Sequence, residues 1–191
     1  PRRPAANGTK KFAEGPNLHD YLRFYRNSVS DYDCVIIGEA DNVPVERAVH
    51  YLQDGEMELM FTFDHMRADC IGTDFIHHKF SVKNFKRALS AWQNALAGRA
   101  WNALYLENHD HARVISRYGS ERYRSESGKA LAAAYMLLQG TPFIYQGQEI
   151  GMTNLRLPSA DMYPDVMTQG NVKLASRWLS PKRVLRLTQD T

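Results

Sequence analysis

The chain alternates between two kinds of apolar pattern. Short continuous apolar runs, which fit buried strands, occur at 34–40, 57–66, 104–106 and 141–149. Segments with apolar residues at spacings of three and four, which predict helices, occur at 15–32, 43–55, 81–98 and 125–140. Strands that alternate with helices predict parallel βα units, and therefore an α/β fold.

The helix within 81–98 has the clearest pattern, because Ser81 can cap its first turn and Gly98 can end it. Its predicted buried stripe consists of Val82, Phe85, Leu89, Trp92 and Leu96. The corresponding stripes of the first and last predicted helices are Leu18, Tyr21, Leu22, Tyr25 and Val29, and Leu131, Ala134, Tyr135 and Leu138. Residues 68–80 are expected to form a polar loop, and the Pro-, Asp- and Arg-rich residues 156–191 to be irregular.

Polar side chains follow each predicted strand at its carboxyl end. They are Glu39, then Asp64 and His65, then Asn108, His109 and Asp110, then Gln146, Gln148 and Glu149. Ionisable groups are costly in a core, so they should lie at the mouths of the strands, where a ligand can meet them. Polar residues at successive carboxyl ends are typical of the catalytic face of a (β/α)8 barrel. Because only four strands are predicted, we expect the chain to form half of such a barrel.

The composition is that of a globular protein with a sizeable core. Of the 191 residues, 43% are hydrophobic and 24% are charged, and the net charge of +3 comes from interspersed charges. This pattern argues against a nucleic-acid surface, and no apolar stretch reaches the roughly 18 to 20 residues of a membrane span. Two cysteines do not make a disulfide framework, and Cys34, which opens an apolar run, is expected to be a buried free thiol. A reducing, cytoplasmic compartment is expected.

Two histidines at alternate positions, His109 and His111, form a candidate metal site, since alternate strand residues share a face. A barrel metallohydrolase needs further ligands from other strands. The candidates for these ligands are His65, His77 and His78, of which the last two lie in the predicted polar loop. The alternative interpretation is that the pair is simply hydrogen-bonded or exposed. No glycine-rich loop has the spacing of a phosphate-binding motif.

Two carboxylates, Glu39 and Asp110, end two different predicted strands, and His109 and Arg113 lie beside the second. Glycoside hydrolysis uses such a pair: one carboxylic acid protonates the leaving oxygen, and another carboxylate attacks or stabilises the cationic sugar. Each acid could instead cap a helix or form a salt bridge. On the residues alone, Asp110 is the candidate nucleophile.

Several motifs resemble the α-amylase superfamily of retaining glycosidases, in its α-glucosidase and oligo-1,6-glucosidase branch. The likeness covers about residues 11 to 155. Two motifs are similar to the strand-five and strand-seven motifs of the superfamily, "VIIGEA" and "LENHDHAR". Four other stretches are similar to that branch: "GTPFIYQGQEIGMTN", "FAEGPNLHDYL", "MFTFDHM" and "AWQNALAGRAWNALYLENHD". Gln148 is a departure, because many relatives have Glu there.

The resemblance implies a fold and a role for each candidate residue. Residues 1–155 would form strands five to eight of the catalytic barrel, with 156–191 an irregular tail. Glu39 would be the proton donor and later the base, buried near acidic neighbours that raise its pKa. Asp110 would stabilise the transition state by binding sugar hydroxyls. His109 and Arg113 would be the substrate-binding residues: His109 would hydrogen-bond the same sugar, and Arg113 would help hold the pocket beside it.

In this family the nucleophile is an aspartate at the end of strand four, which we expect to precede residue 1. The implied reaction is double displacement on a small oligosaccharide, with no metal or organic cofactor and no nucleic-acid or membrane partner. Three alternatives stay open: a non-catalytic homologue, such as the ancillary heavy chains of amino-acid transporters; a metal-dependent hydrolase using His109 and His111; and a transglycosylating sucrose or trehalose isomerase.

Overall fold

The computed structural model describes residues 15–41, 43–53, 55–71, 73–159, 162–164, 166–180 and 183–184. The chain divides into two compact units. The first consists of residues 1–104 and 138–142, and the second of residues 105–137 and 143–191.

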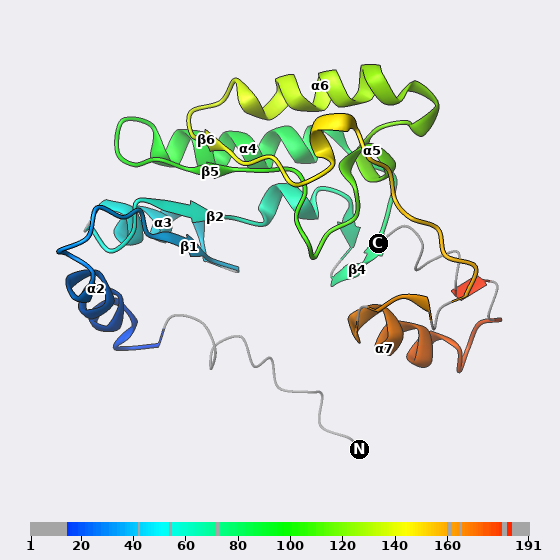
Figure 1. Ribbon diagram of the computed structural model, residues 1–191, viewed down its shortest axis with the longest axis horizontal. Coiled ribbons are helices and arrows are strands. Elements are labelled where there is room, and N and C mark those ends of the chain that lie inside the picture. Colours follow the sequence, from blue (N-terminus) through cyan, green and yellow to red (C-terminus); the bar gives the residue numbers. More distant parts are fainter. Residues whose placement is uncertain are drawn as a thin grey trace. The chain divides into compact units, whose positions relative to one another are not determined.

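The first unit contains a parallel sheet of four short strands in the order β1-β2-β5-β6 (Figure 1). The strands are β1 (Ile37–Glu39), β2 (Leu59–Phe61), β5 (Ala103–Leu104) and β6 (Thr141–Pro142). Ile37 lies opposite Leu59, Phe61 opposite Ala103, and Ala103 opposite Thr141. The parallel α/β arrangement predicted from the sequence is therefore confirmed, although each strand is shorter than its apolar run.

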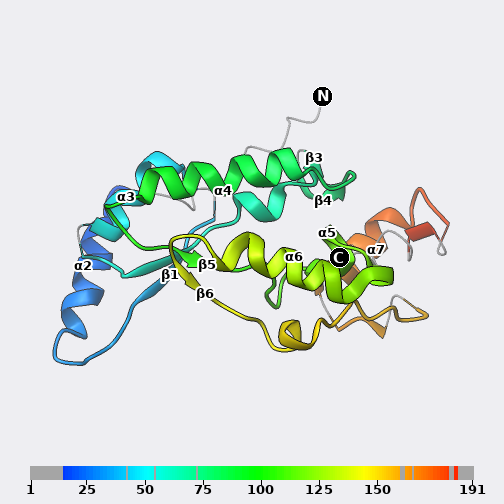
Figure 2. The ribbon, with the colours of Figure 1, turned by 90° about the horizontal axis from the view of Figure 1, so that it is seen from above.

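Among the described residues, the α-helices that accompany this sheet are α2 (Leu18–Ser28), α3 (Val45–Gln53) and α4 (Val82–Leu96). Helices α3 and α4 lie side by side on one face of the sheet (Figure 2). The predicted cap of α4 is confirmed, because Ser81 Oγ accepts a hydrogen bond of 3.2 Å from the Asn84 N–H. Gly98 follows α4 with φ of 66°, a left-handed conformation that ends a helix readily when the residue is glycine.

The core of the first unit lies between these helices and the sheet. Its buried members are Ala48, Val49, Tyr51, Met57, Met60, Trp92 and Leu96. Leu18 and Leu22 of α2 are half-buried against it. Burial of each large side chain contributes about 1.5–3 kcal/mol, so the apolar face of α4 is a main source of stability.

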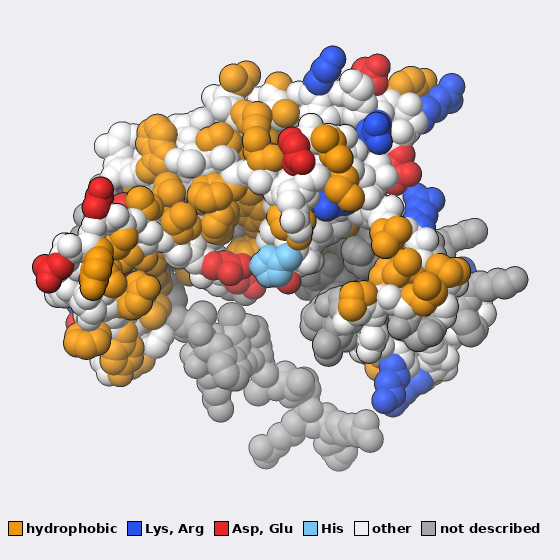
Figure 3. All heavy atoms as spheres, in the orientation of Figure 1, with side chains coloured by type: hydrophobic (Ala, Val, Ile, Leu, Met, Phe, Trp, Pro, Cys, Tyr) orange, Lys and Arg blue, Asp and Glu red, His pale blue; other side chains and the backbone are white. Residues whose placement is uncertain are grey.

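Some apolar residues that were expected to be buried are exposed. Cys34 is exposed, and Val35 and Ile37 are 62% and 41% exposed. Ile37 lies in β1, which stands at an edge of the described sheet with β2 as its neighbour, and Cys34 and Val35 precede this strand. In α2, Tyr21 and Tyr25 are 67% and 56% exposed, so only part of the predicted stripe packs on the core. Apolar side chains accordingly gather on the surface over α2 (Figure 3).

Two other predicted stripes need smaller corrections: Val82 at the start of α4 is 68% exposed, and Ala134 is exposed as well.

The predicted polar loop over 68–80 contains a hairpin instead. Strands β3 (Cys70–Ile71) and β4 (Thr73–His77) pair antiparallel, with Cys70 opposite His77. The segment is rich in β-branched and aromatic residues, which favour pairing once a turn brings them together.

The second unit consists of helices and turns that follow β5 and β6. Its elements in the described ranges include α5 (Val114–Tyr118), η2 (Glu121–Tyr123), α6 (Arg124–Met136), η3 (Gln148–Ile150) and α7 (Val166–Ala175). Helix α7 lies in a stretch expected to be irregular, so that expectation is wrong for these ten residues. Its apolar pattern is weak, which is why periodicity did not reveal it. No helix in the described ranges has the length and apolarity to cross a membrane.

Candidate active site

Glu39 is the last residue of β1 and lies opposite Phe61 of β2. The next residue, Ala40, donates its N–H to the Phe61 carbonyl over 3.1 Å, which fixes the backbone at the strand end. The Glu39 side chain is exposed, so the burial expected from the resemblance is not found. The cause is the position of β1 at the edge of the described sheet.

The predicted His–Asp pair lies in a loop of the second unit. His109 and Asp110 are both exposed, with 74% and 60% of their side-chain surfaces accessible. His109 Nε2 lies 3.3 Å from the nearer carboxylate oxygen of Asp110, so the two side chains are in contact. Exposed polar groups that are held together at a loop tip are suited to binding hydroxyls of a ligand.

Asn108 organises the tip of this loop. Its side-chain oxygen accepts hydrogen bonds from the Asp110 N–H at 3.1 Å and from His111 Nδ1 at 2.7 Å. The bond to the residue two positions on is an Asx turn, which sets the backbone around His109. The described part of the chain has no group of three His, Cys, Asp or Glu side chains that could hold a metal ion.

Glu107 and Arg113 form the base of the loop. Glu107 is 4% exposed, and one of its oxygens lies 2.9 Å from Arg113 Nη1. The Arg113 guanidinium also donates to the Gln146 carbonyl over 2.7 Å and covers the Tyr145 ring at 5.0 Å. Removing one partner of such a buried pair costs about 3–5 kcal/mol, because it leaves an unpaired charge. The pair therefore fastens the loop firmly.

Sequence reasoning expected Arg113 beside the sugar and did not single out Glu107. The structure places the Arg113 side chain against the protein itself, 18% exposed. A usable signal was present: an acid and an arginine six residues apart flank the His–Asp motif. The bonding partners of the acid lie in the same loop, whereas Gln146 and Asn154, which hold Arg113 in place, lie outside the local pattern.

Gln148 lies beside a buried tyrosine. Gln148 Nε2 donates to the Tyr135 hydroxyl over 3.2 Å, and Gln148 Oε1 accepts the Tyr145 N–H over 3.1 Å. Burial raises the pKa of Tyr135; the bond from Gln148 lowers it and the charge of Glu107 raises it further, with a net upward shift. Because the Gln148 amide donates to Tyr135 and accepts from Tyr145, a neutral side chain satisfies both partners at this position.

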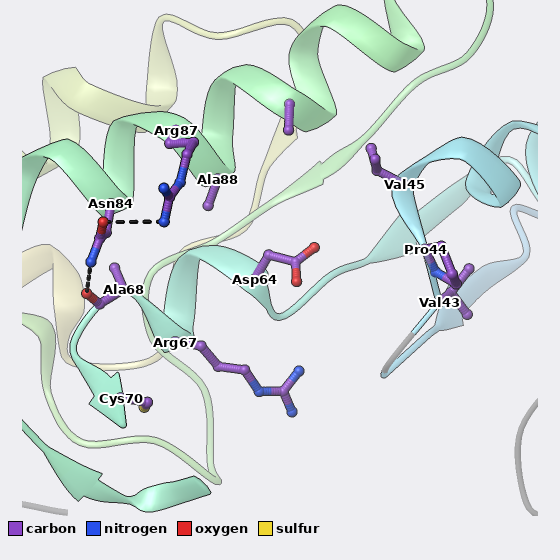
Figure 4. Close-up of a pocket in the computed structure, with 11 residues that line it drawn as sticks. Val43, Pro44, Val45, Asp64, Arg67, Ala68, Cys70, Asn84, Arg87 and Ala88 are labelled. Carbon is purple, nitrogen blue, oxygen red and sulfur yellow. Dashed lines mark hydrogen bonds between the residues drawn. The ribbon is translucent and has the colours of Figure 1, made fainter. Parts of the chain in front are cut away.

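A cavity of about 570 Å³ lies in the first unit beside α4 (Figure 4). Its polar lining comes from Asp64, Arg67, Asn84 and Arg87. Most of these side chains have polar partners within the protein. Arg67 lies 2.7 Å from Asp41, and Arg87 donates to Asn84 over 3.2 Å. Asp64 accepts the indole N–H of Trp92. These contacts explain how three charged side chains are accommodated around one hollow.

A family model described as the catalytic domain of alpha amylase matches residues 1–180. This chain belongs to the α-amylase catalytic-domain family. The α/β fold and the recognised motifs agree with that membership. Among its relatives are an oligo-1,6-glucosidase of Bacillus cereus, 42% identical, and one of Parageobacillus thermoglucosidasius, 39% identical. Each alignment covers 85% of this chain and 30% of the relative.

Relatives of other specificities are also similar to this α-amylase family chain. A trehalose-6-phosphate hydrolase of Bacillus subtilis is 37% identical over 87% of the chain and 31% of its own length. The crystal structure of such a hydrolase from Bacillus licheniformis has a TM-score of 0.87 at 31% identity, covering 98% of this chain and 35% of that one. Isomaltulose synthase from Erwinia rhapontici gives a TM-score of 0.85 at 28% identity, covering 97% and 34%. The chain thus spans about a third of the length of the relatives it matches.

Proposed function

We propose that this chain is the acid/base and sugar-holding part of a retaining α-glucosidase. The observation that carries the proposal is the placement of its two motifs. Glu39 of the "VIIGEA" motif is the last residue of β1. The "LENHDHAR" motif follows β5, and β1 and β5 belong to the same parallel sheet. Catalytic residues of (β/α)8 enzymes lie beyond the carboxyl ends of the strands.

Each residue then has a role in double displacement. Glu39 protonates the leaving oxygen and, in the second step, takes a proton from the attacking water. Its exposure at the edge of the described sheet is compatible with this role if the complete barrel buries it. His109 and Asp110 bind hydroxyls of the distorted sugar and stabilise the transition state. Arg113 holds the loop rather than the sugar, because its guanidinium bonds Glu107 and the Gln146 carbonyl.

We also propose that β1, β2, β5 and β6 are strands five to eight of the barrel. Strand order and direction agree with this assignment, since the four strands are parallel and in chain order. Val35, Ile37 and the aromatic face of α2 are exposed, as expected if four further strands and their helices complete the core. Residues 1–155 would belong to the barrel and residues 156–191 to the loop and tail that follow it, which include α7. The nucleophile would come from strand four of the complete protein.

The relatives support a small substrate with an α-linked glucosyl group. Those named above are oligo-1,6-glucosidases and trehalose-6-phosphate hydrolases, and one structural neighbour is an isomaltulose synthase. Hydrolysis of malto- or isomalto-oligosaccharides is therefore the activity we propose.

The test is to express the full-length protein that contains this chain and to measure glucose release from maltose, isomaltose and a nitrophenyl α-glucoside. We expect turnover of at least one substrate with retention, seen as initial release of α-glucose by NMR. A folded protein that hydrolyses none of them, with Glu39 intact, would support the non-catalytic homologue instead. Formation of transfer products from sucrose in place of glucose would favour the isomerase alternative.

A further inference from the structure

Glu107 is buried at the point where the chain leaves β5. Tyr105 and Leu106, which precede it, are 3% and 0% exposed, and the Glu107 side chain is only 2% exposed. Both carboxylate oxygens have partners within the same loop. One accepts the Val114 N–H over 2.9 Å, and the other accepts a hydrogen bond from Arg113 over 2.9 Å. Glu107 therefore closes residues 107–114 into a ring.

Arg113 fastens this ring to a distant part of the chain. Its guanidinium donates to the Gln146 carbonyl over 2.7 Å and lies over the Tyr145 ring. Its backbone N–H donates to Asn154 Oδ1, also over 2.7 Å. The base of the loop is thus fixed by contacts to residues that are more than thirty positions away in sequence.

The tip of the loop has much weaker support. The His109 and Asp110 side chains are exposed, and the contact between them is 3.3 Å long. The Asx turn at Asn108 sets the backbone of the tip but belongs to the loop itself. The orientation of the tip relative to the rest of its unit therefore depends on the base, where Glu107 takes part in two of the contacts.

We propose that Glu107 is a positioning residue for His109 and Asp110. This inference rests on the proposed function, in which those two residues hold the sugar. Glu107 does not touch the substrate; it fixes the loop through Arg113 and the Val114 N–H. Because a displacement of about 1 Å can cost a hundredfold in rate, loss of this fixation should lower catalysis strongly.

The first experiment measures kinetics of the full-length protein with Glu107→Gln. The Gln amide can still accept the Val114 N–H, but it presents an N–H group to Arg113 in place of the carboxylate. We expect kcat/KM to fall about 10- to 100-fold, equally for an aryl and an alkyl α-glucoside, because leaving-group protonation is not affected. Glu107→Asp, which keeps the charge, should lose less than Glu107→Gln.

Glu121→Gln is the matched control. Glu121 lies in the same unit, is half-exposed, and pairs with Ser116 and Arg156 at the surface. We expect its kcat/KM to stay within about twofold of the original protein. Equal losses in the Glu107→Gln and Glu121→Gln variants would overturn the proposal.

The second experiment separates positioning from general stability, and it does not depend on activity. Amide hydrogen exchange is compared between the original protein and Glu107→Gln, over residues 108–114 and over α6. Positioning predicts exchange at least about tenfold faster in the loop with α6 unchanged, since the loop opens locally. Equally faster exchange in the loop and in α6, or unchanged exchange in both segments, would overturn the proposal. An inactive original protein with the selective exchange effect would reject the proposed function alone.

Discussion

The indole N–H of Trp92 donates a hydrogen bond of 2.6 Å to the carboxylate of Asp64. Trp92 belongs to the buried face of α4 and Asp64 to the chain that follows β2, so this bond links the helix to a strand end. Asp64 is one of the polar residues that the sequence places at a strand mouth. Its contact explains the residue as a structural acid that fixes α4.

We expect Asp64→Leu to destabilise the first unit by about 1–3 kcal/mol, because it leaves the buried Trp92 N–H without an acceptor. Asp64→Asn is the matched control, since its amide oxygen can still accept the bond, and it should cost less than about 1 kcal/mol. Urea unfolding followed by tryptophan fluorescence measures both values. Equal effects of the two substitutions would show that the bond is unimportant for stability.

Glu39→Gln in the full-length protein should reduce hydrolysis of maltose-type substrates by about 10²- to 10⁴-fold. A nitrophenyl α-glucoside should suffer much less, because its leaving group needs little protonation. Steady-state kinetics on both substrates test this, with Glu46→Gln, an exposed acid of α3, as control. Equal losses on the two substrates would remove Glu39 from the acid role.

The 191 residues expressed alone should not hydrolyse an aryl α-glucoside at a useful rate. They contain a proposed acid and a proposed sugar-holding acid, but no residue assigned to form the covalent glucosyl intermediate. The assay requires removal of host glucosidases. Robust turnover that disappears in Glu39→Gln would show that the chain contains a nucleophile after all.

Treatment with a chelator should leave the activity of the full-length protein unchanged, because acid catalysis and displacement by a carboxylate need no metal. The measurement is turnover of a nitrophenyl α-glucoside before and after dialysis against EDTA, with metal analysis of the dialysed protein. A loss of activity that zinc restores would favour the alternative in which His109 and His111 bind a metal ion.

Stability should fall at alkaline pH because of Tyr135, which is fully buried and has a pKa raised above 10.0. Its neutral form is favoured in the folded state, so the folded protein holds more protons than the unfolded one above pH 10. The stability that Tyr135 contributes is fully present below its pKa in the unfolded state. It is lost as pH rises through its pKa in the folded state. Urea unfolding at pH 9 and pH 11 should show a smaller decline for Tyr135→Phe than for the original protein.

Local signals in the sequence were sufficient for several features. The cap at Ser81 and the stop at Gly98 lie next to the helix they bound, so α4 could be predicted from its own residues. The alternation of apolar runs and helical periods likewise predicted the parallel sheet. The hairpin at 70–77 and helix α7 were missed, because their patterns are short or weak and tertiary contacts decided between loop and regular structure.

Burial could not be inferred from the apolar runs alone. Cys34 and Val35 belong to a run that looks like a buried strand, yet both are exposed, because they precede β1, which is itself an edge strand of the described sheet. An isolated run carries no information about which strands stand next to it. The sequence determined that this segment is apolar, and the arrangement of the sheet determined which of its residues are covered.

The candidate site divides in the same way. The sequence by itself determined which ionisable residues are present and that they follow strands, because side-chain chemistry and strand ends are local properties. Only the tertiary structure decided that Glu107 is buried. It also decided that Arg113 turns toward the protein, since Gln146 and Asn154, which accept its hydrogen bonds, lie more than thirty residues away in sequence. A buried charge is stable only beside its partner, and folding is what brings the partner there.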